Sequence, residues 1–320
     1  MNRHAKDLRP SRKPALLDGA APLIERRDHV APSIFRPENL LREARRQKGL
    51  AAGSVPPVCI LDPDGDIVAH VRGRHAAEPC PQWACYHSTM WSWRAGDLAC
   101  GIVGHVVGGS FAVLAAEQLF ASGCELLISV TSAGQIIDVG PPPYYILIER
   151  ALRDEGTSYH YLPPSTYASA DPALIALAAG AAARAGRQVH VGDTWTTDAP
   201  FRETEESIAS RRRAGILAVE MEAASLYAFA AACGRPVICL AHVSNQLGCV
   251  DGDFEKGDHN GAAGSLELVM ALAAAWRRKT RDAGTAPALP LPLEGERVGV
   301  RGLSARSEFA DTPPHPAISP

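Results

Sequence analysis

The sequence predicts an α/β protein in which a central mixed β-sheet is flanked by helices. Short runs rich in β-branched residues recur along the chain, glycine turns follow several of them, and the apolar spacing then changes to that of a helix. The order strand, glycine turn, helix, strand is the unit of a parallel sheet. With 320 residues, 46% of them hydrophobic, the chain can bury a sizeable core in one large domain or at most two.

The first half of the chain supplies one such unit. A short helix is expected at residues 32–48. After Gly108 and Gly109 the apolar positions fit a helix that ends near Gly123, and residues 125–131 follow as a strand. Between these helices, successive strands are predicted at residues 58–61, 67–71, 83–91 and 98–107.

A second unit follows in the other half. Strands are predicted at residues 188–194, 217–221 and 237–243, and helices at residues 203–214, 223–233 and 264–278. Residues 1–30 are charged and rich in proline and glycine, so we expect a flexible arm there. Residues 31–281 form the predicted catalytic domain. Residues 282–320 have too little apolar content to bury and are predicted to be a disordered tail.

Composition excludes several classes of function. The net charge is −3 with both signs interspersed, so we expect neither a nucleic-acid groove nor a membrane anchor. The longest apolar stretches are interrupted before the ~20 residues of a membrane span, and no apolar core follows the basic N-terminus, so a cytoplasmic protein is expected. The spacing of the eight cysteines does not fit a metal site. We therefore expect the cysteines to be reduced residues of the core and expect no bound metal.

Two carboxylates mark a candidate site. Glu220 and Glu222 stand where a predicted strand passes into a helix, and strands of parallel sheets present ligand groups at their carboxyl ends. A carboxylate accepts two hydrogen bonds at once and so matches the paired 2′ and 3′ hydroxyls of a ribose. The alternative is a charge that complements the helix dipole, which would need only one of the two.

The segment VEMEAASLYAFA, residues 219–230, resembles the VEME segment of hexameric purine nucleoside phosphorylases, uridine phosphorylases and related nucleosidases. The resemblance implies that Glu222 binds the ribose hydroxyls, Met221 packs on the sugar and Glu220 lies beside them. Three further segments agree in order, so the resemblance spans roughly residues 83–278. They are VVGGSFAVLAAEQLFASGCELLISVTSAGQI, RDEGTSYHYLPP and VGDTWTTDAPFRETEES.

The first of these segments resembles the family's glycine-rich turn, helix and phosphate loop. Backbone N–H groups at Gly134, with the hydroxyls of Thr131 and Ser132, would cradle an oxyanion. A tight strand exit is the alternative. The arginine that a neighbouring subunit contributes in the family falls near His87 or Ser88, and His87 is the fourth candidate phosphate ligand.

The last segment resembles the base-binding loop. The base would rest against Pro200 and Phe201, with Arg202 and Glu203 at its polar edge. Ordinary core packing is the alternative for Phe201. Asn245, at the end of a predicted strand, would hydrogen-bond the departing base and is a candidate catalytic residue with Glu222. Its alternative is a turn former.

The chain departs from the family in ways that bear on the nucleophile. Ser129 stands where phosphorolytic members carry an arginine, and ILDPDGDIV, residues 60–68, is the nearest segment to their Gly-Asp-Pro loop. Each missing arginine contact to an anion forfeits about 1.5–3 kcal/mol. Compensation could come from His87 or from three arginines, Arg72, Arg74 and Arg94. Hydrolytic members, by contrast, carry an aspartate at Asn245, and an amide donates no full proton.

The resemblance implies phosphorolysis of a nucleoside, uridine-like ahead of purine, to free base and ribose 1-phosphate. Inorganic phosphate is then the co-substrate, and neither a metal nor an organic cofactor is expected. Two alternatives stay open: a nucleosidase that uses water, and a nucleoside-binding protein without turnover. A homo-oligomer, either a dimer or a trimer of dimers, is also implied.

Overall fold

The computed structural model describes residues 22–24, 27–249, 251–254 and 256–282. Most of the predicted arm (1–30) and nearly all of the predicted tail (282–320) lie outside these residues. In the described part of the arm, a guanidinium nitrogen of Arg27 lies 2.5 Å from Nδ1 of His160, and His29 Nε2 lies 3.2 Å from the carbonyl oxygen of Tyr159. The end of the arm therefore contacts the folded part of the chain.

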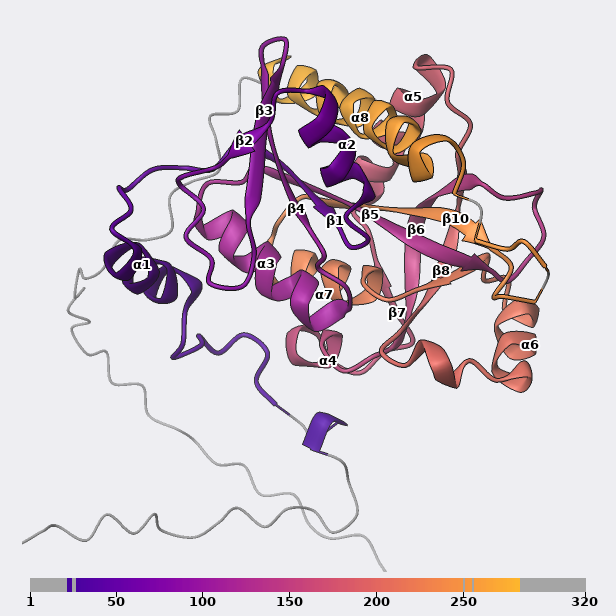
Figure 1. The fold of residues 1–320 in the computed structure, drawn as a ribbon. Helices are drawn as coiled ribbons and strands as arrows, with labels where there is room; N and C mark the ends of the chain where they lie inside the picture. The colour runs from indigo at the N-terminus through magenta and orange to yellow at the C-terminus, as the bar shows by residue number, and fades with distance from the viewer. Residues whose placement is uncertain (1–21, 25–26, 250, 255, 283–320) are drawn as a thin grey trace, which may run out of the picture. The chain divides into compact units, whose positions relative to one another are not determined.

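The described residues build one ten-stranded mixed sheet, which confirms the predicted fold class (Figure 1). The strand order is β10-β6-β8-β9-β5-β1-β4-β3-β2, with β7 paired to β6. The strands are β1 Val58–Asp62, β2 Glu78–Pro79, β3 Met90–Ala95, β4 Leu98–Gly104, β5 Leu126–Gln135, β6 Tyr144–Asp154, β7 Tyr167–Ser169, β8 His190–Thr197, β9 Ala218–Glu220 and β10 Val237–Asn245.

One part of the sheet closes on itself. Strand β5 is parallel to its neighbour β10 and antiparallel to its neighbour β9. Because β10 also pairs with β6 at the other end of the strand order, the strands β5, β9, β8, β6 and β10 form a closed ring. In this ring Gly134 lies opposite Val219 of β9 and opposite Asn245 of β10. The register therefore brings three of the segments singled out in the sequence to one end of the sheet.

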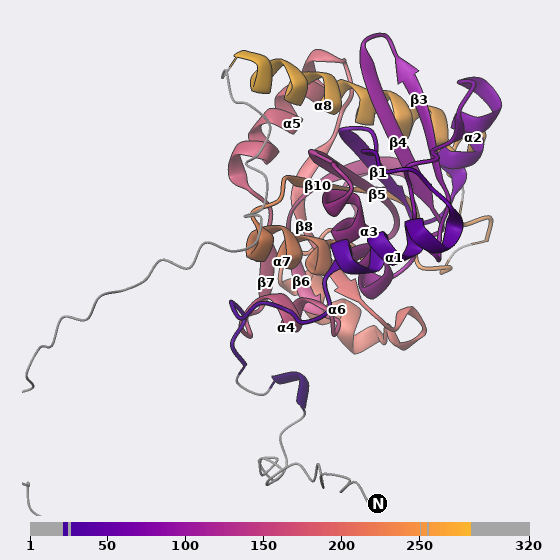
Figure 2. The ribbon, with the colours of Figure 1, turned by 90° about the vertical axis from the view of Figure 1, so that its left-hand side faces the viewer.

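Helices cover the sheet on both sides. Figures 1 and 2 show α5 and α8 over one side and α3, α4 and α7 over the other, and α2 packs against α8. Strands β1 and β10 are buried along their whole length, as expected for strands covered on both faces. The helices are α1 Pro37–Lys48, α2 Asp66–Arg74, α3 Gly109–Ala121, α4 Ser158–Tyr161, α5 Pro172–Arg184, α6 Glu205–Arg213, α7 Ala223–Cys233 and α8 Ala262–Asp282, with 3-10 turns η1 Pro22–Ile24, η2 Pro200–Arg202 and η3 Asp258–Gly261.

The predicted strand at residues 67–71 is wrong, because this segment is the middle of helix α2. Asp62 accepts a hydrogen bond from the backbone N–H of Val68 at 2.8 Å, which fixes the first turn after Gly65. Ile67, Val68 and Val71 are then buried on one helical face. A short apolar run of this kind fits a buried helix as well as a strand, so periodicity could not separate the two.

The predicted strand at residues 83–91 is wrong over most of its length, since β3 begins only at Met90. Trp83 lies in a turn instead. Its backbone N–H bonds the carbonyl of Cys80, and its indole N–H donates to Ser88. Strand β6 and helix α5 were not predicted, although α5 carries a clear start signal in the N-cap Asp171 followed by Pro172.

All eight cysteines are free and six of them are buried, as predicted. Within the described residues, no three or more His, Cys, Asp or Glu side chains are grouped so that they could hold a metal ion. None of the helices in the same part of the chain has the length and hydrophobicity needed to cross a membrane.

Candidate functional site

The candidate site is organised around Glu222, at the junction of β9 and α7. Its side chain is buried, with 1% of its surface exposed. One carboxylate oxygen accepts a hydrogen bond from the backbone N–H of Gly108 at 2.6 Å, and the other accepts one from Oγ1 of Thr131 at 2.6 Å. Glu222 therefore ties the start of α3 and the strand β5 to the VEME segment.

Glu220 has a different environment. One of its oxygens accepts from the hydroxyls of Thr194 and Thr196, at 3.1 and 2.5 Å. The other oxygen accepts hydrogen bonds from the backbone N–H groups of Glu222 and Ala223, both at 2.7 Å. These N–H groups are the donors at the start of α7. With four hydrogen bonds its acceptor sites are filled. Glu220 thus satisfies the helix terminus, and Glu222 is left as the carboxylate with spare acceptor capacity.

Burial changes the acidity of both glutamates. Loss of solvent raises the pKa of Glu220 and raises the pKa of Glu222 to about 7, with the charge of Glu220 as the second cause for Glu222. The hydrogen bonds from Thr131 and Gly108 act in the opposite direction on the pKa of Glu222. Near neutral pH Glu222 is therefore close to the point at which it gains or loses a proton.

The expected phosphate loop at residues 131–134 is wrong in conformation, because β5 continues to Gln135. The strand is longer than predicted because both β9 and β10 pair with its end. The Thr131 hydroxyl donates to Glu222, and the Ser132 hydroxyl donates to Oδ1 of Asp64 at 3.1 Å. A Cβ on Gly134 would lie 2.3 Å from the Leu247 side chain, so only glycine fits there without a shift.

A small, acidic cavity lies beside the 131–134 segment. It has a volume of about 20 Å³, enough for a water molecule and less than a phosphate ion requires. Three carboxyl groups line it: Asp62 at the end of β1, Asp64 in the loop that follows, and Asp66 at the start of α2. Burial raises the pKa of Asp62 to about 6. The Lys256 ammonium lies 2.7 Å from both Asp64 and Asp66, so one cation pairs with two of the three carboxyl groups.

The segment 60–68 therefore does lie beside the candidate anion site, but it brings acids to it. The roles of Asp64, Gly108 and Lys256 were not predicted from the sequence. The run DPDGD directly after an apolar strand was a usable signal for Asp64, and the Gly108-Gly109 pair was one for a close backbone approach. Nothing in the sequence pointed to Lys256.

Asn245 belongs to the same cluster. It ends β10, with 9% of its surface exposed. Its side-chain amide donates to the carbonyl of Ala133 at 3.3 Å, and its side-chain oxygen accepts from the N–H of Leu247 at 3.0 Å. These bonds hold the amide against β5, next to the 131–134 segment.

The other predicted residues lie outside this cluster or at its edge. The turn η2 consists of Pro200, Phe201 and Arg202 and follows β8. In β8, Thr196 lies opposite Glu220 of the neighbouring strand β9. The side chain of Phe201 is 99% exposed, so the alternative of core packing is wrong. Met221 is half-buried between β9 and α7.

The candidate compensating residues are dispersed. His87 is exposed, and its contacts are with Cys85 and Tyr86. Arg72 stacks on Trp91, with the guanidinium carbon 4.1 Å from the ring centroid, and Arg94 donates to the carbonyl of Asp97. None of these contacts reaches the 131–134 segment. Arg74 lies in a separate cavity on α2.

Comparison with known proteins identifies the family of this chain. The sequence profile of the phosphorylase superfamily matches residues 80–275. A DeoD-type purine nucleoside phosphorylase of Colwellia psychrerythraea is 30% identical over 139 residues, which are 43% of this chain and 59% of the relative. A guanosine phosphorylase of Halorubrum lacusprofundi is 29% identical over 167 residues, 51% of this chain and 64% of the relative.

A uridine phosphorylase of Thermococcus kodakarensis is 29% identical over 194 residues, 56% of this chain and 68% of the relative. The matches to the purine and guanosine enzymes thus span less than two thirds of those proteins. The family profile covers well over half of the described fold, from the turn before β3 into α8. This chain belongs to the phosphorylase superfamily.

Proposed function

We propose that this chain cleaves the N-glycosidic bond of a nucleoside with inorganic phosphate, giving the free base and ribose 1-phosphate. The observation that carries the proposal is Glu222, a buried carboxylate held between Gly108 and Thr131 at the end of the sheet. Relatives named as purine, guanosine and uridine phosphorylases support the reaction class.

Glu222 would hold the sugar. Its two oxygens accept hydrogen bonds from Gly108 and Thr131, and the carboxylate keeps acceptor capacity that suits the adjacent ribose hydroxyls. Breaking the glycosidic bond builds positive charge on the sugar, and an ionised carboxylate in a buried site stabilises that charge more than it stabilises the neutral substrate. The ionised form of Glu222 is then the active one, with Met221 packed against the sugar.

Asn245 would hydrogen-bond the departing base. An amide donates a hydrogen bond but no full proton, so we propose a base that leaves without protonation, uridine-like ahead of purine. Phe201, exposed beside the end of β8, and Pro200 would form the surface against which the base rests, with Arg202 at its polar edge.

A second candidate is hydrolysis, and the small cavity beside the 131–134 segment favours it. Asp62, Asp64 and Asp66 line a space of about 20 Å³. Carboxylates repel a phosphate dianion, whereas they accept a proton from an attacking water. Ser129, in the place of the family's arginine, adds no positive charge to offset them.

Base release from a panel of nucleosides, run side by side with and without inorganic phosphate, tests both candidates. Release only with phosphate supports phosphorolysis, and equal release in both supports hydrolysis. Tight nucleoside binding without release would identify a binding protein. Glu222→Ala should abolish binding or turnover, with the exposed Glu78→Ala on β2 as the matched control. Full activity of Glu222→Ala would overturn the assignment of the site.

We also propose a cytoplasmic homo-oligomer, a dimer or a trimer of dimers. Light scattering on the purified chain gives the number of subunits directly, and a monomeric mass would contradict this proposal.

A further inference from the structure

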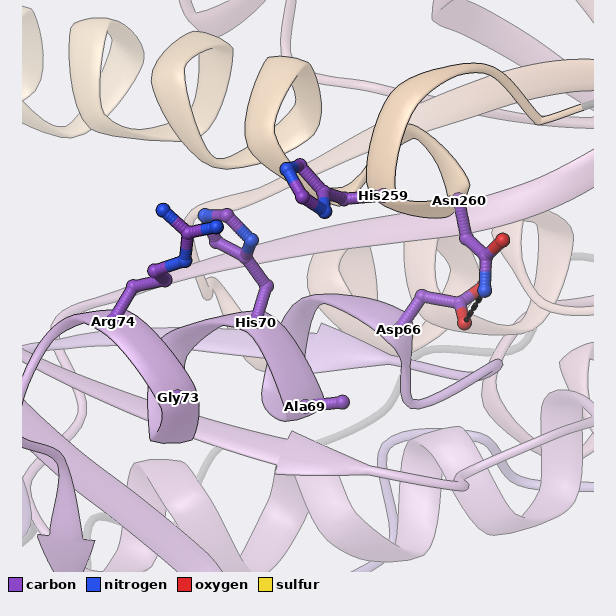
Figure 3. Close-up of a pocket in the computed structure, with 7 residues that line it drawn as sticks. All are labelled: Asp66, Ala69, His70, Gly73, Arg74, His259 and Asn260. Atoms are coloured by element: carbon purple, nitrogen blue, oxygen red, sulfur yellow. Dashed lines mark hydrogen bonds between the residues drawn. The ribbon is translucent and has the colours of Figure 1, made fainter.

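A second cavity lies between helix α2 and the turn η3 (Figure 3). Its volume is about 320 Å³, at the lower end of the roughly 300–1,000 Å³ typical of small-molecule sites. It shares Asp66 and Asn260 with the small acidic cavity beside β5, so the two are neighbours. The proposed reaction uses none of its cationic side chains. The lining residues are Asp66, Ala69, His70, Gly73, Arg74, His259 and Asn260.

The cavity gathers groups that carry or can take up positive charge. The rings of His70 and His259 approach each other from α2 and η3, with centroids 5.6 Å apart, and His75 lies 6.0 Å from His70. Figure 3 shows the Arg74 guanidinium beside the His70 ring. Arg74 makes no hydrogen bond or ion pair with any residue that the structure describes. A guanidinium is always charged and offers five donors, so this one has full capacity for an anion.

The one acid of the cavity does not compensate this charge. One oxygen of Asp66 accepts from Lys256 at 2.7 Å, and the other accepts from the side-chain amide of Asn260 at 3.0 Å. Figure 3 shows the amide turned toward Asp66, away from the histidines. The charge of Asp66 is thus paired with the Lys256 ammonium, and among the described residues no ion pair joins Asp66 to Arg74.

The pKa of His70 is lowered in this setting. Partial burial, followed by the charges of His259, His75 and Arg74, lowers the pKa of His70. The charged groups around His70 are thus Arg74 and His75 from the same helix and His259 from η3, with Asp66 and Lys256 paired nearby. A bound anion would relieve this repulsion and favour the protonated rings.

We propose that this cavity binds a phosphate group, carried by inorganic phosphate or by a phosphorylated small molecule. An arginine presents its donors in a planar fork that matches two phosphate oxygens, and protonated imidazoles add charge-assisted hydrogen bonds to the third. The volume leaves room for a sugar-sized body behind the phosphate. Binding at this anion pocket needs no catalytic step, and so it stands or falls separately from the proposed reaction.

Calorimetric titration of the full chain tests the anion pocket with three probes: inorganic phosphate, ribose 5-phosphate and uncharged ribose. Phosphate and ribose 5-phosphate should bind and ribose should not. Tighter binding of ribose 5-phosphate would identify a phosphorylated small molecule as the ligand, and equal or weaker binding would identify inorganic phosphate.

Variants locate the bound probe. Arg74→Gln and His70→Gln should each weaken binding about tenfold or more, since each removes a charge-assisted contact. Arg94→Gln, at an exposed arginine on β3, is the matched control and should leave affinity unchanged. Circular dichroism confirms that each variant is folded.

The affinity for sulfate, whose charge is constant between pH 6 and 8, shows whether protonation of the histidines contributes to anion binding. Its affinity should rise as the pH falls through this range, and His70→Gln should reduce that rise. No binding of either phosphate probe would overturn the proposal. The proposal would also be overturned if Arg74→Gln kept the affinity for phosphate and Ser132→Ala lost it. The anion would then lie beside β5.

Discussion

Replacing Glu222 by glutamine should change how the stability of this protein depends on pH. Burial, followed by the charge of Glu220, raises the pKa of Glu222 from 4.5 to about 7. Between these two values the folded protein holds a proton on Glu222 that the unfolded chain has released. The stability that this proton provides is complete below pH 4.5 and is lost as the pH rises through about 7.

The magnitude follows from the two pKa values. One pKa unit corresponds to ~1.4 kcal/mol, so the free energy of unfolding should fall by about 3 kcal/mol between pH 4.5 and 8 on account of this group. Glutamine has nearly the same shape and no charge to bury. Its oxygen can accept from Gly108, and its amide can donate to the Thr131 hydroxyl, which also lies 3.2 Å from the carbonyl of Ser132.

Urea unfolding of the wild type and of Glu222→Gln, at pH 4.5 and at pH 8, measures this difference. Relative to wild type, the variant should gain about 3 kcal/mol between the two pH values. Glu78→Gln, at an exposed position, serves as the matched control and should show no gain. An equal pH dependence in Glu222→Gln and wild type would refute the reasoning, because Glu222 would then not carry the linked proton.

Three further substitutions test the packing around the site. Gly109→Ala places a Cβ 2.1 Å from the Ser225 hydroxyl and should cost about 1–3 kcal/mol of stability, measured by urea unfolding; an unchanged midpoint would contradict this close approach. Tyr227→Phe removes a buried hydroxyl that donates to the carbonyl of Ile148 at 2.6 Å and should lower the melting temperature through a loss of about 1–3 kcal/mol, whereas no shift would argue against the bond. Ser129→Ala removes a buried hydroxyl that has no partner among the described residues, so the melting temperature should stay or rise; a clear fall would point to an unseen partner.

The sequence by itself predicted the mixed sheet flanked by helices and the junction that holds Glu220 and Glu222. These features depend on local signals: apolar periodicity, glycine turns, and polar residues where a strand ends. Where local signals were ambiguous the prediction failed. Residues 67–71 have an apolar run that suits a strand, yet the bond from Val68 to Asp62 starts a helix.

The tertiary structure alone decided what surrounds the two glutamates. Gly108 and Thr131 bind Glu222 from 114 and 91 residues away, and Lys256 reaches Asp64 across 192 residues. Sheet register and helix packing set such contacts, and no pattern within a short window encodes them. For the same reason the sequence identified Arg74 only as one of several arginines. Helix α2 places Arg74 one turn from His70, and the packing of α2 against η3 adds His259 from a segment 185 residues further along the chain.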